Sequence, residues 1–252
     1  MTSPAPGFRD HFSRVAGGYA TFRPHYPPAL FATLAAQTRR RDTAWDCATG
    51  SGQAAVGLAG WFEHVVATDA SREQLGAAAR HPNVQYVCCL AEQAPILSGA
   101  VDLVATAQSL HWFEVPRFFA EARRVVAPGG LVVAWCYGLA AVDPTIDAVV
   151  GRFYHDTVGS YWPPQRTLVD TGYRTVAFPF TEIALPPLAI EQQLTLDAFA
   201  GYVRTWSATQ RYVAERGSDP VAALVAELAP LWASGTGPRT VRWPLAVRAG
   251  RA

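Results

Sequence analysis

The sequence predicts an α/β protein built on a doubly wound, mainly parallel sheet. From about residue 43 to 136, short apolar runs alternate with helical stretches, which is typical of βαβ units. The apolar runs contain few polar residues, as strands do when helices cover both faces of a parallel sheet. A turn with two glycines, at residues 49–52, follows the first run, and Asp69 ends the second.

The elements of the first half follow in order along the chain. Ser71 followed by Gln74 fits a capping box at the start of the second expected helix. Residues 128–130, with the sequence Pro-Gly-Gly, are expected to end the third helix. Strands are expected at residues 43–48, 64–68, 84–89, 101–107 and 131–136, and helices at 53–60, 71–81 and 116–126.

The alternation of short apolar runs with helical stretches ends after Tyr137. No internal repeat or linker follows, so we expect a single domain. Helices are expected at about 147–155, from Asp197 and from Asp219, and extended chain at 176–185 and 240–247. The expected parts of the domain are an N-terminal helical flap at residues 1–42, a cofactor-binding core at 43–137, and the remaining strands with a helical lid at about 186–238, within residues 138–252.

Composition excludes several classes of protein. Half of the 252 residues are apolar, which allows a sizeable core, and the net charge of +1 favours neither nucleic acid nor a membrane surface as partner. All 21 basic residues are arginine, which excludes a lysine nucleophile. The four cysteines form no CxxC pattern, so we expect no metal site. The N-terminus has no basic start followed by an apolar run, so we expect no signal peptide and a cytoplasmic location.

The most informative pattern is the turn after the first expected strand. Glycines between a strand and a helix let the backbone approach a ligand and direct amide groups at it. A carboxylate at the end of the next strand, here Asp69, can accept both hydroxyls of a ribose. The alternatives are an ordinary tight turn and a carboxylate that caps the helix beginning at Ser71. The order of strand, turn, helix, strand and acid favours nucleoside binding.

This segment resembles the class I S-adenosylmethionine-dependent methyltransferases. Residues 46–52 match that family's acidic-x-Gly-x-Gly-x-Gly motif, with Ala48 in the place of the first glycine. Residues 91–96 are similar to the adenine loop, and Leu90 stands where many members have an aspartate. The resemblance continues through the fourth strand to the Pro-Gly-Gly sequence at 128–130.

The resemblance implies a Rossmann-like, seven-stranded sheet whose seventh strand is antiparallel. It also implies S-adenosylmethionine as the cofactor and S-adenosylhomocysteine as the product. Adenine is expected on the backbone of Ala91, helped by Glu92, and the ribose on Asp69. The residues expected to bind the cofactor are Tyr19, Arg23, Asp46, Ala48, Thr49, Gly50, Gly52, Asp69, Ala70, Ala91, Glu92 and Gln108.

Three segments outside the turn are similar to a narrower group, the trans-aconitate methyltransferase-like (methyltransferase type 11) subgroup. They are residues 19–27, 108–113 and 201–207. The subgroup methylates small carboxylic acids or related small molecules, and its N-terminal segment folds over the cofactor. The resemblance therefore implies a small-molecule acceptor.

Several side chains are candidates for the reacting centre. Tyr19, Tyr26 and Trp112 can face the sulfonium cation, or they belong to the core. Gln108 is expected to contact the methionine part of the donor. His111 is the expected catalytic residue, either as a general base or as a side chain that shapes the pocket. The residues expected to bind the acceptor are Tyr26, His111, Trp112, Arg204 and Trp206. Arg23, Arg174 and Arg204 can each clamp an acidic group, and Arg204 is favoured because it lies between Tyr202 and Trp206.

The sequence therefore predicts an enzyme that transfers a methyl group from S-adenosylmethionine to an oxygen of a small molecule, with a carboxylate favoured over a hydroxyl. The chain is expected to act as a monomer or homodimer, without nucleic acid or membrane. One alternative is a non-catalytic, nucleoside-binding module of the same fold. The other is an NAD(P)-dependent oxidoreductase, which ordinarily shows a complete G-x-G-x-x-G motif.

Overall fold

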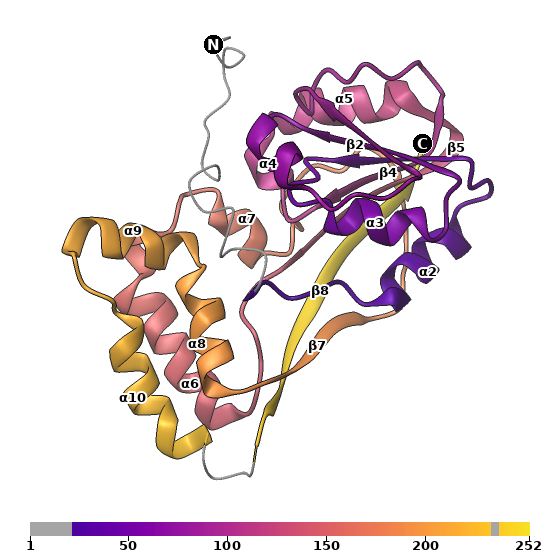
Figure 1. Ribbon diagram of the computed structural model, residues 1–252. Helices are drawn as coiled ribbons and strands as arrows, with labels where there is room; N and C mark the ends of the chain where they lie inside the picture. Colours follow the sequence, from indigo (N-terminus) through magenta and orange to yellow (C-terminus); the bar gives the residue numbers. More distant parts are fainter. Residues whose placement is uncertain (1–21, 233–236) are drawn as a thin grey trace.

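The computed structural model describes residues 22–232 and 237–252, which contain one large sheet with helices on both faces (Figure 1). The strand order is β3-β2-β1-β4-β5-β8-β6, and β7 also pairs with β8. The first five strands are parallel, which confirms the doubly wound α/β sheet. The strands are β1 (Thr43–Cys47), β2 (His64–Asp69), β3 (Val84–Cys88), β4 (Val101–Ala107), β5 (Val126–Tyr137), β6 (Thr181–Ile183), β7 (Leu188–Leu194) and β8 (Arg239–Arg251).

Helices cover the two faces of the parallel part because side chains alternate between the faces of each strand. On β4, Leu103 packs with α2 (Pro28–Gln37) and α3 (Gln53–Ala59), whereas Val104 packs with α5 (Val115–Val125). The short helix α4 (Arg72–Ala77) begins at Ser71, whose hydroxyl accepts a hydrogen bond from the amide of Gln74, as the capping box predicts.

The antiparallel end of the sheet departs from the expected count. The last strand, β8, is antiparallel to β5, as the resemblance implies. The sixth strand is in two pieces, β6 and β7, which pair in succession with the same edge of β8. Pro186 and Pro187 lie between the pieces, and proline cannot donate a hydrogen bond to a ladder. The sheet therefore has eight named strands arranged as a seven-stranded one.

A second group of helices lies at the far ends of β7 and β8 (Figure 1). Its core contains Trp243 of β8 and Ile190 of β7 together with apolar side chains of the helices. Asp143 and Thr195 cap the starts of the first two long helices with their side-chain oxygens. The helices are α6 (Pro144–Arg152), α8 (Leu196–Arg204), α9 (Ser207–Arg216) and α10 (Val221–Trp232), with a π-helical turn at Phe153–Thr157 and a 3-10 turn at Gly159–Tyr161. The short helix α7 (Arg166–Asp170) instead contacts β5, and its Val169 packs in the core of the parallel sheet.

The helical lid differs from its expected bounds at its start. Residues 188–194, expected in the lid, form β7, because their alternating buried and exposed side chains pair with β8. Residues 144–161, which precede the expected lid, form α6 and the two turns after it and share the core of the lid helices. The N-terminal flap at 1–42 is described only from residue 22 onward, where α2 packs on α3.

Within the described ranges, no helix is long and apolar enough to cross a membrane. The same ranges contain no group of three His, Cys, Asp or Glu side chains placed to hold a metal ion.

Candidate functional site

The site lies where β1 and β4 end, at the carboxyl edge of the sheet. Because β1 and β4 are adjacent and parallel, with Cys47 beside Thr106, the turn after β1 lies next to Gln108, which follows β4. Ala48, Gln108 and Tyr173 are the non-glycine residues with positive φ in the described part of the chain, at 56°, 54° and 60°. Strained backbone of this kind collects at functional sites, and all three residues border this edge.

The turn after β1 leaves open space beside its backbone. Gly50 has φ of 54°, and a Cβ added there would have no atom within 4 Å. Gly52 has φ of 80°, and a Cβ there would clash with the hydroxyl oxygen of Tyr86, which donates to the carbonyl of Ala79. Glycine at 52 is therefore needed for packing, whereas Gly50 leaves space beside the backbone. Ala48 adopts the left-handed conformation that glycine would adopt at lower cost.

Asp69 ties the turn to the second strand. Its Oδ2 accepts a hydrogen bond from the amide of Gly50 at 2.9 Å, and its Oδ1 accepts one from the amide of Ser71 at 2.8 Å. The two interpretations of Asp69 are therefore compatible, because one carboxylate reaches both the glycine turn and the start of α4. Ala70 follows it, and its carbonyl accepts from the thiol of Cys88.

Asp46 lies behind the turn and is fully buried. Its Oδ2 accepts a hydrogen bond from the hydroxyl of Thr49 at 2.6 Å, and its Oδ1 has no partner in hydrogen-bonding geometry among the described residues. Burial raises the pKa of this carboxyl to about 7, opposed by the Thr49 hydroxyl and assisted by the charge of Asp69. The open space at Gly50 and the carboxylate of Asp69 at the edge fit an adenosine-bearing ligand.

The expected adenine loop lies at the start of α5. The carboxylate of Glu92 accepts a hydrogen bond from the amide of Glu114 at 2.9 Å, so it braces the loop. Ala94 donates its amide to Glu121 at 2.7 Å, and Arg124 pairs with the same carboxylate. Ala91 is buried within this braced loop.

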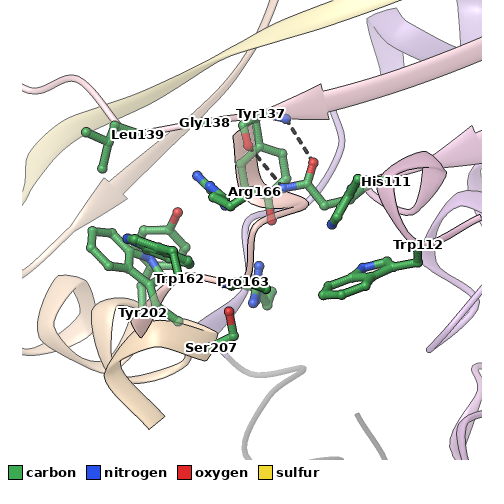
Figure 2. A pocket seen from close by; sticks show the side chains of 13 residues that line it. His111, Trp112, Tyr137, Gly138, Leu139, Trp162, Pro163, Arg166, Tyr202 and Ser207 are labelled. Atoms are coloured by element: carbon green, nitrogen blue, oxygen red, sulfur yellow. Dashed lines mark hydrogen bonds between the residues drawn. The ribbon is translucent and has the colours of Figure 1, made fainter. Parts of the chain in front are cut away.

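A cavity opens beyond the ends of β4 and β5. Figure 2 shows Trp162 and Tyr202 on one side of it and His111 and Trp112 on the other. Its walls come from both the sheet unit and the helical group. The described residues that line it are Arg23, Gln108, His111, Trp112, Tyr137, Gly138, Leu139, Trp162, Pro163, Arg166, Tyr202, Trp206 and Ser207.

Gln108 joins the two strands that end at this cavity. Its side-chain Nε2 donates to the carbonyl of Tyr137 at 3.0 Å, and its Oε1 accepts from the Tyr137 amide at 3.0 Å (Figure 2). Much of its hydrogen-bonding capacity is therefore used to hold the end of β5. The contact with the methionine part of the donor stays a prediction.

His111 is buried in the 3-10 turn Leu110–Trp112, with its Nδ1 3.0 Å from the hydroxyl of Tyr173. Burial, assisted by the positive charge of Arg166, lowers the pKa of His111 to about 3. A base of this strength accepts protons poorly at neutral pH. The geometry therefore favours the pocket-shaping interpretation of His111 over the general-base one.

The structure places the other expected acceptor residues in different surroundings. Trp112 and Trp206 line the cavity. Arg204 does not, because it lies exposed in the last turn of α8 and pairs with Asp219 at 2.9 Å. Tyr26 is held among core aromatics, with its ring 5.5 Å from that of Trp135. Tyr19, expected near the cofactor, lies outside the described residues.

Two other arginines line the cavity, and one of them, Arg23, is among the three that the sequence offers as clamps for an acidic group. Arg23, expected at the cofactor, donates through Nη2 to the carbonyl of Thr205 at 3.4 Å. Arg166 was missed altogether. The signal for it was an arginine near Trp162 with an acid, Asp170, four residues later, and nothing in that short segment indicates that it meets β4.

The comparisons with known proteins agree with this geometry. A family model described as "Methyltransferase domain" matches residues 45–134. A protein of Dictyostelium discoideum named as a methyltransferase is 32% identical over 226 residues, 87% of this chain and 86% of its own length. A malonyl-[acyl-carrier protein] O-methyltransferase of Marinomonas is 32% identical, over 49% of this chain and 48% of its own. The solved structure of a type II methyltransferase from Anaeromyxobacter dehalogenans superposes with a TM-score of 0.86 at 46% identity, over 91% of this chain and 97% of that one.

Proposed function

The chain belongs to the class I S-adenosylmethionine-dependent methyltransferases, and from this premise we propose that it methylates an oxygen of a small-molecule acceptor, with a carboxylate as the preferred acceptor. The narrower likeness to the trans-aconitate methyltransferase-like subgroup is part of this proposal. One relative, matched over about half of its length, is named as an O-methyltransferase, in line with oxygen as the accepting atom. The family match gives the oxidoreductase alternative no support.

The observation that carries the proposal is the cavity at the ends of β4 and β5. It adjoins the turn after β1, as an acceptor site must adjoin the donor in an in-line transfer. Its described lining contains aromatic rings and two arginines and no aspartate or glutamate. Aromatic faces favour a sulfonium cation, and arginines favour an anionic acceptor.

The proposed donor site uses residues at the carboxyl edge. When bound, S-adenosylmethionine supplies a methyl group that its sulfonium sulfur has already activated. In the proposal, Gly50 leaves room for the donor beside the backbone, Asp69 accepts the ribose hydroxyls, and Ala91 offers its backbone to adenine. The remaining expected contacts, Thr49 and Ala70 among them, stay proposals of the same kind.

The neutral form of His111 and the ionisation of the acceptor favour a carboxylate over a hydroxyl as the group that is methylated. An ionised carboxylate already carries the lone pair that forms the new bond to carbon, so the protein has no proton to remove. A hydroxyl acceptor needs a base, and the low pKa of His111 makes it a weak one. In this proposal His111 and Tyr173 hold the cavity wall, and Gln108 keeps β5 in place beside it.

Identifying the bond that carries the transferred methyl group tests the proposal. The protein is incubated with methyl-labelled S-adenosylmethionine and a panel of aliphatic, unsaturated and aromatic acids with their alcohol counterparts, and products are treated with mild alkali. A methyl ester releases labelled methanol, whereas a methyl ether keeps its label. We expect alkali-labile label with acids.

Two results contradict the proposal in different ways. Alkali-stable label points to a hydroxyl or nitrogen acceptor. Heat of binding with S-adenosylhomocysteine but no transfer to any metabolite pool supports the non-catalytic module. The proposed role of Asp69 is tested with Asp69→Ala in the same calorimetric titration. Asp197→Ala, which removes an exposed acid at the start of α8, is its matched control.

A further inference from the structure

Arg166 is one of the two arginines that line the proposed acceptor cavity, which is the cavity at the ends of β4 and β5. It begins α7, and its side chain is 17% exposed. Burying a guanidinium is costly unless its donors find partners. Its surroundings therefore show which of its donors are already used.

One end of this side chain is fixed. Its Nε donates to the hydroxyl of Tyr154 at 2.8 Å and to Oδ1 of Asp170 at 3.1 Å, and the Tyr154 hydroxyl donates to the same Oδ1 at 2.8 Å. The guanidinium carbon lies 4.6 Å from the centre of the Trp162 ring. Burial disfavours the charged form, but Tyr154 and Asp170 outweigh it and raise the pKa of Arg166. The side chain is thus a permanently charged, immobilised group.

The other end is open. Neither Nη1 nor Nη2 of Arg166 forms a hydrogen bond with a described residue, so four N–H groups have no partner in that part of the chain. Arg166 lines both the acceptor cavity and the neighbouring surface opening, whereas its Nε partners, Tyr154 and Asp170, line only that opening. A planar fork with free N–H groups matches the two oxygens of a carboxylate.

We propose that Arg166 is the receptor for a carboxylate that anchors the acceptor, and that Tyr154 and Asp170 are positioning residues that hold its guanidinium in place. The inference rests on the proposed function and adds the chemical class of the acceptor, a flat carboxylic acid. Flatness follows from the walls, because Trp112, Trp162 and other aromatic rings bound the cavity. The charge follows from the two lining arginines and the lack of a described acid among the lining residues.

An acid and its amide of the same shape separate charge recognition from general packing. Benzoate and cinnamate are titrated by calorimetry against benzamide and cinnamamide, with the protein saturated by S-adenosylhomocysteine. We expect the wild type to bind each acid at least about tenfold more tightly than its amide, because charge-assisted hydrogen bonds are the stronger ones. Arg166→Gln is expected to weaken acid binding about 10- to 100-fold and leave amide binding unchanged.

Further variants separate a receptor from a merely structural arginine. Asp170→Asn and Tyr154→Phe are expected to lower the ratio of acid to amide affinity by about threefold to tenfold. Each variant weakens a hydrogen bond that holds the Arg166 guanidinium in place, but the guanidinium keeps its charge. Arg166→Lys is expected to restore part of the ratio. The matched control is Arg152→Gln, an exposed arginine of α6 that pairs with Glu227, and it should leave the ratio as in the wild type.

The inference is overturned if the wild type binds acids and amides equally or binds no acid of the panel. It is also overturned if Arg166→Gln lowers acid and amide binding together, or if Arg204→Gln rather than Arg166→Gln removes the preference for acids. If Arg166→Gln does not fold, the ratio measured with Asp170→Asn decides. Failure of the proposed function gives a different result, namely no labelled methyl transfer while the acid preference persists.

Discussion

The donor edge and the acceptor cavity adjoin each other but are built in different ways. At the donor edge, Asp46, Gly50 and Asp69 lie close in sequence and bond to near neighbours. The acceptor cavity draws on residues from Arg23 to Ser207, which meet only in the folded chain. In the proposed assignment, a local motif binds the cofactor that the whole family shares, whereas side chains that only the tertiary structure brings together bind the acceptor.

The two regions also carry opposite charge. The carboxylate of Asp69 stands at the donor edge, with the carboxyl of Asp46 buried behind it, and two arginines, Arg23 and Arg166, line the acceptor cavity. This separation suits a cationic donor and an anionic acceptor. Variants of Asp69, Arg166 and His111 each change one region and show whether the other is affected.

The largest expected effect is on the pH dependence of stability, through Asp46. Its carboxyl has a pKa of about 7 in the folded chain against an ordinary 3.8, so the folded state keeps a proton that the unfolded state loses. The free energy of unfolding therefore falls as pH rises from about 4 to about 7, by about 4 kcal/mol relative to Asp46→Asn. Urea unfolding of both proteins across this range measures the difference.

His111 titrates with the opposite sign and must be separated from Asp46. Its pKa of about 3 lies below the ordinary 6.5, so its contribution to stability is lost as pH falls from about 6.5 toward 3. The comparison of wild type with Asp46→Asn cancels this term, because both proteins retain His111. Parallel stability curves for the two proteins would contradict the buried, protonated state of Asp46.

Donor affinity is expected to depend on Asp69 and not on the cavity. Asp69→Ala should weaken binding of S-adenosylhomocysteine about 100-fold, since two hydrogen bonds from ribose to a charged group are lost. Arg166→Gln should leave that affinity within about twofold. Calorimetry with both variants makes the measurement, and equal losses would mean that the two regions act as one.

Turnover is expected to respond to His111 while donor binding does not. His111→Ala should lower kcat by about tenfold or less, because it removes a wall of the cavity rather than a base. A loss of 100-fold or more, together with a pH profile that loses its acidic limb, would restore the general-base interpretation. Equal losses in turnover and donor affinity would indicate a structural role.

The smallest expected effect concerns Ala48. Glycine fits its φ of 56° at lower cost, so Ala48→Gly should raise the free energy of unfolding by about 1 kcal/mol. Ala226→Gly, at an exposed position of α10, is expected to lower it by a similar amount. Thermal and urea unfolding compare the two, and destabilisation by both would show that Ala48 is not strained.

The fold of the glycine turn and the place of Asp69 beside it could be predicted from the sequence because the signals for them are local. The strand pattern, the two glycines and the acid that ends the second strand all lie within one βαβ unit. In the structure, the amide nitrogen of Gly50 lies 2.9 Å from Oδ2 of Asp69. The Rossmann-like sheet followed from the same alternation. Only the break at Pro186 and Pro187 was missed, because the segment after it was interpreted as part of the helical lid.

The acceptor side was predicted poorly because exposure and pairing are tertiary properties. Arg204 was chosen for its aromatic neighbours in sequence, yet the helix turns it toward Asp219. Arg166 lies in a short helix with a weak pattern, and the contacts that fix it come from Tyr154 and Asp170. No local rule shows which of 21 arginines will border the cavity.

The length of β8 has a consequence for anyone who wishes to change acceptor preference by exchanging parts between relatives. This one strand pairs with β5 in the sheet and with β7 near the helices, and its Trp243 donates a hydrogen bond to Tyr202 in the cavity wall. A chimera cut only at the helix boundaries would separate that wall from the strand that supports it. Grafts should therefore carry residues 188–194 and 239–245 together with the helices, so that the transplanted pocket keeps its own backbone support.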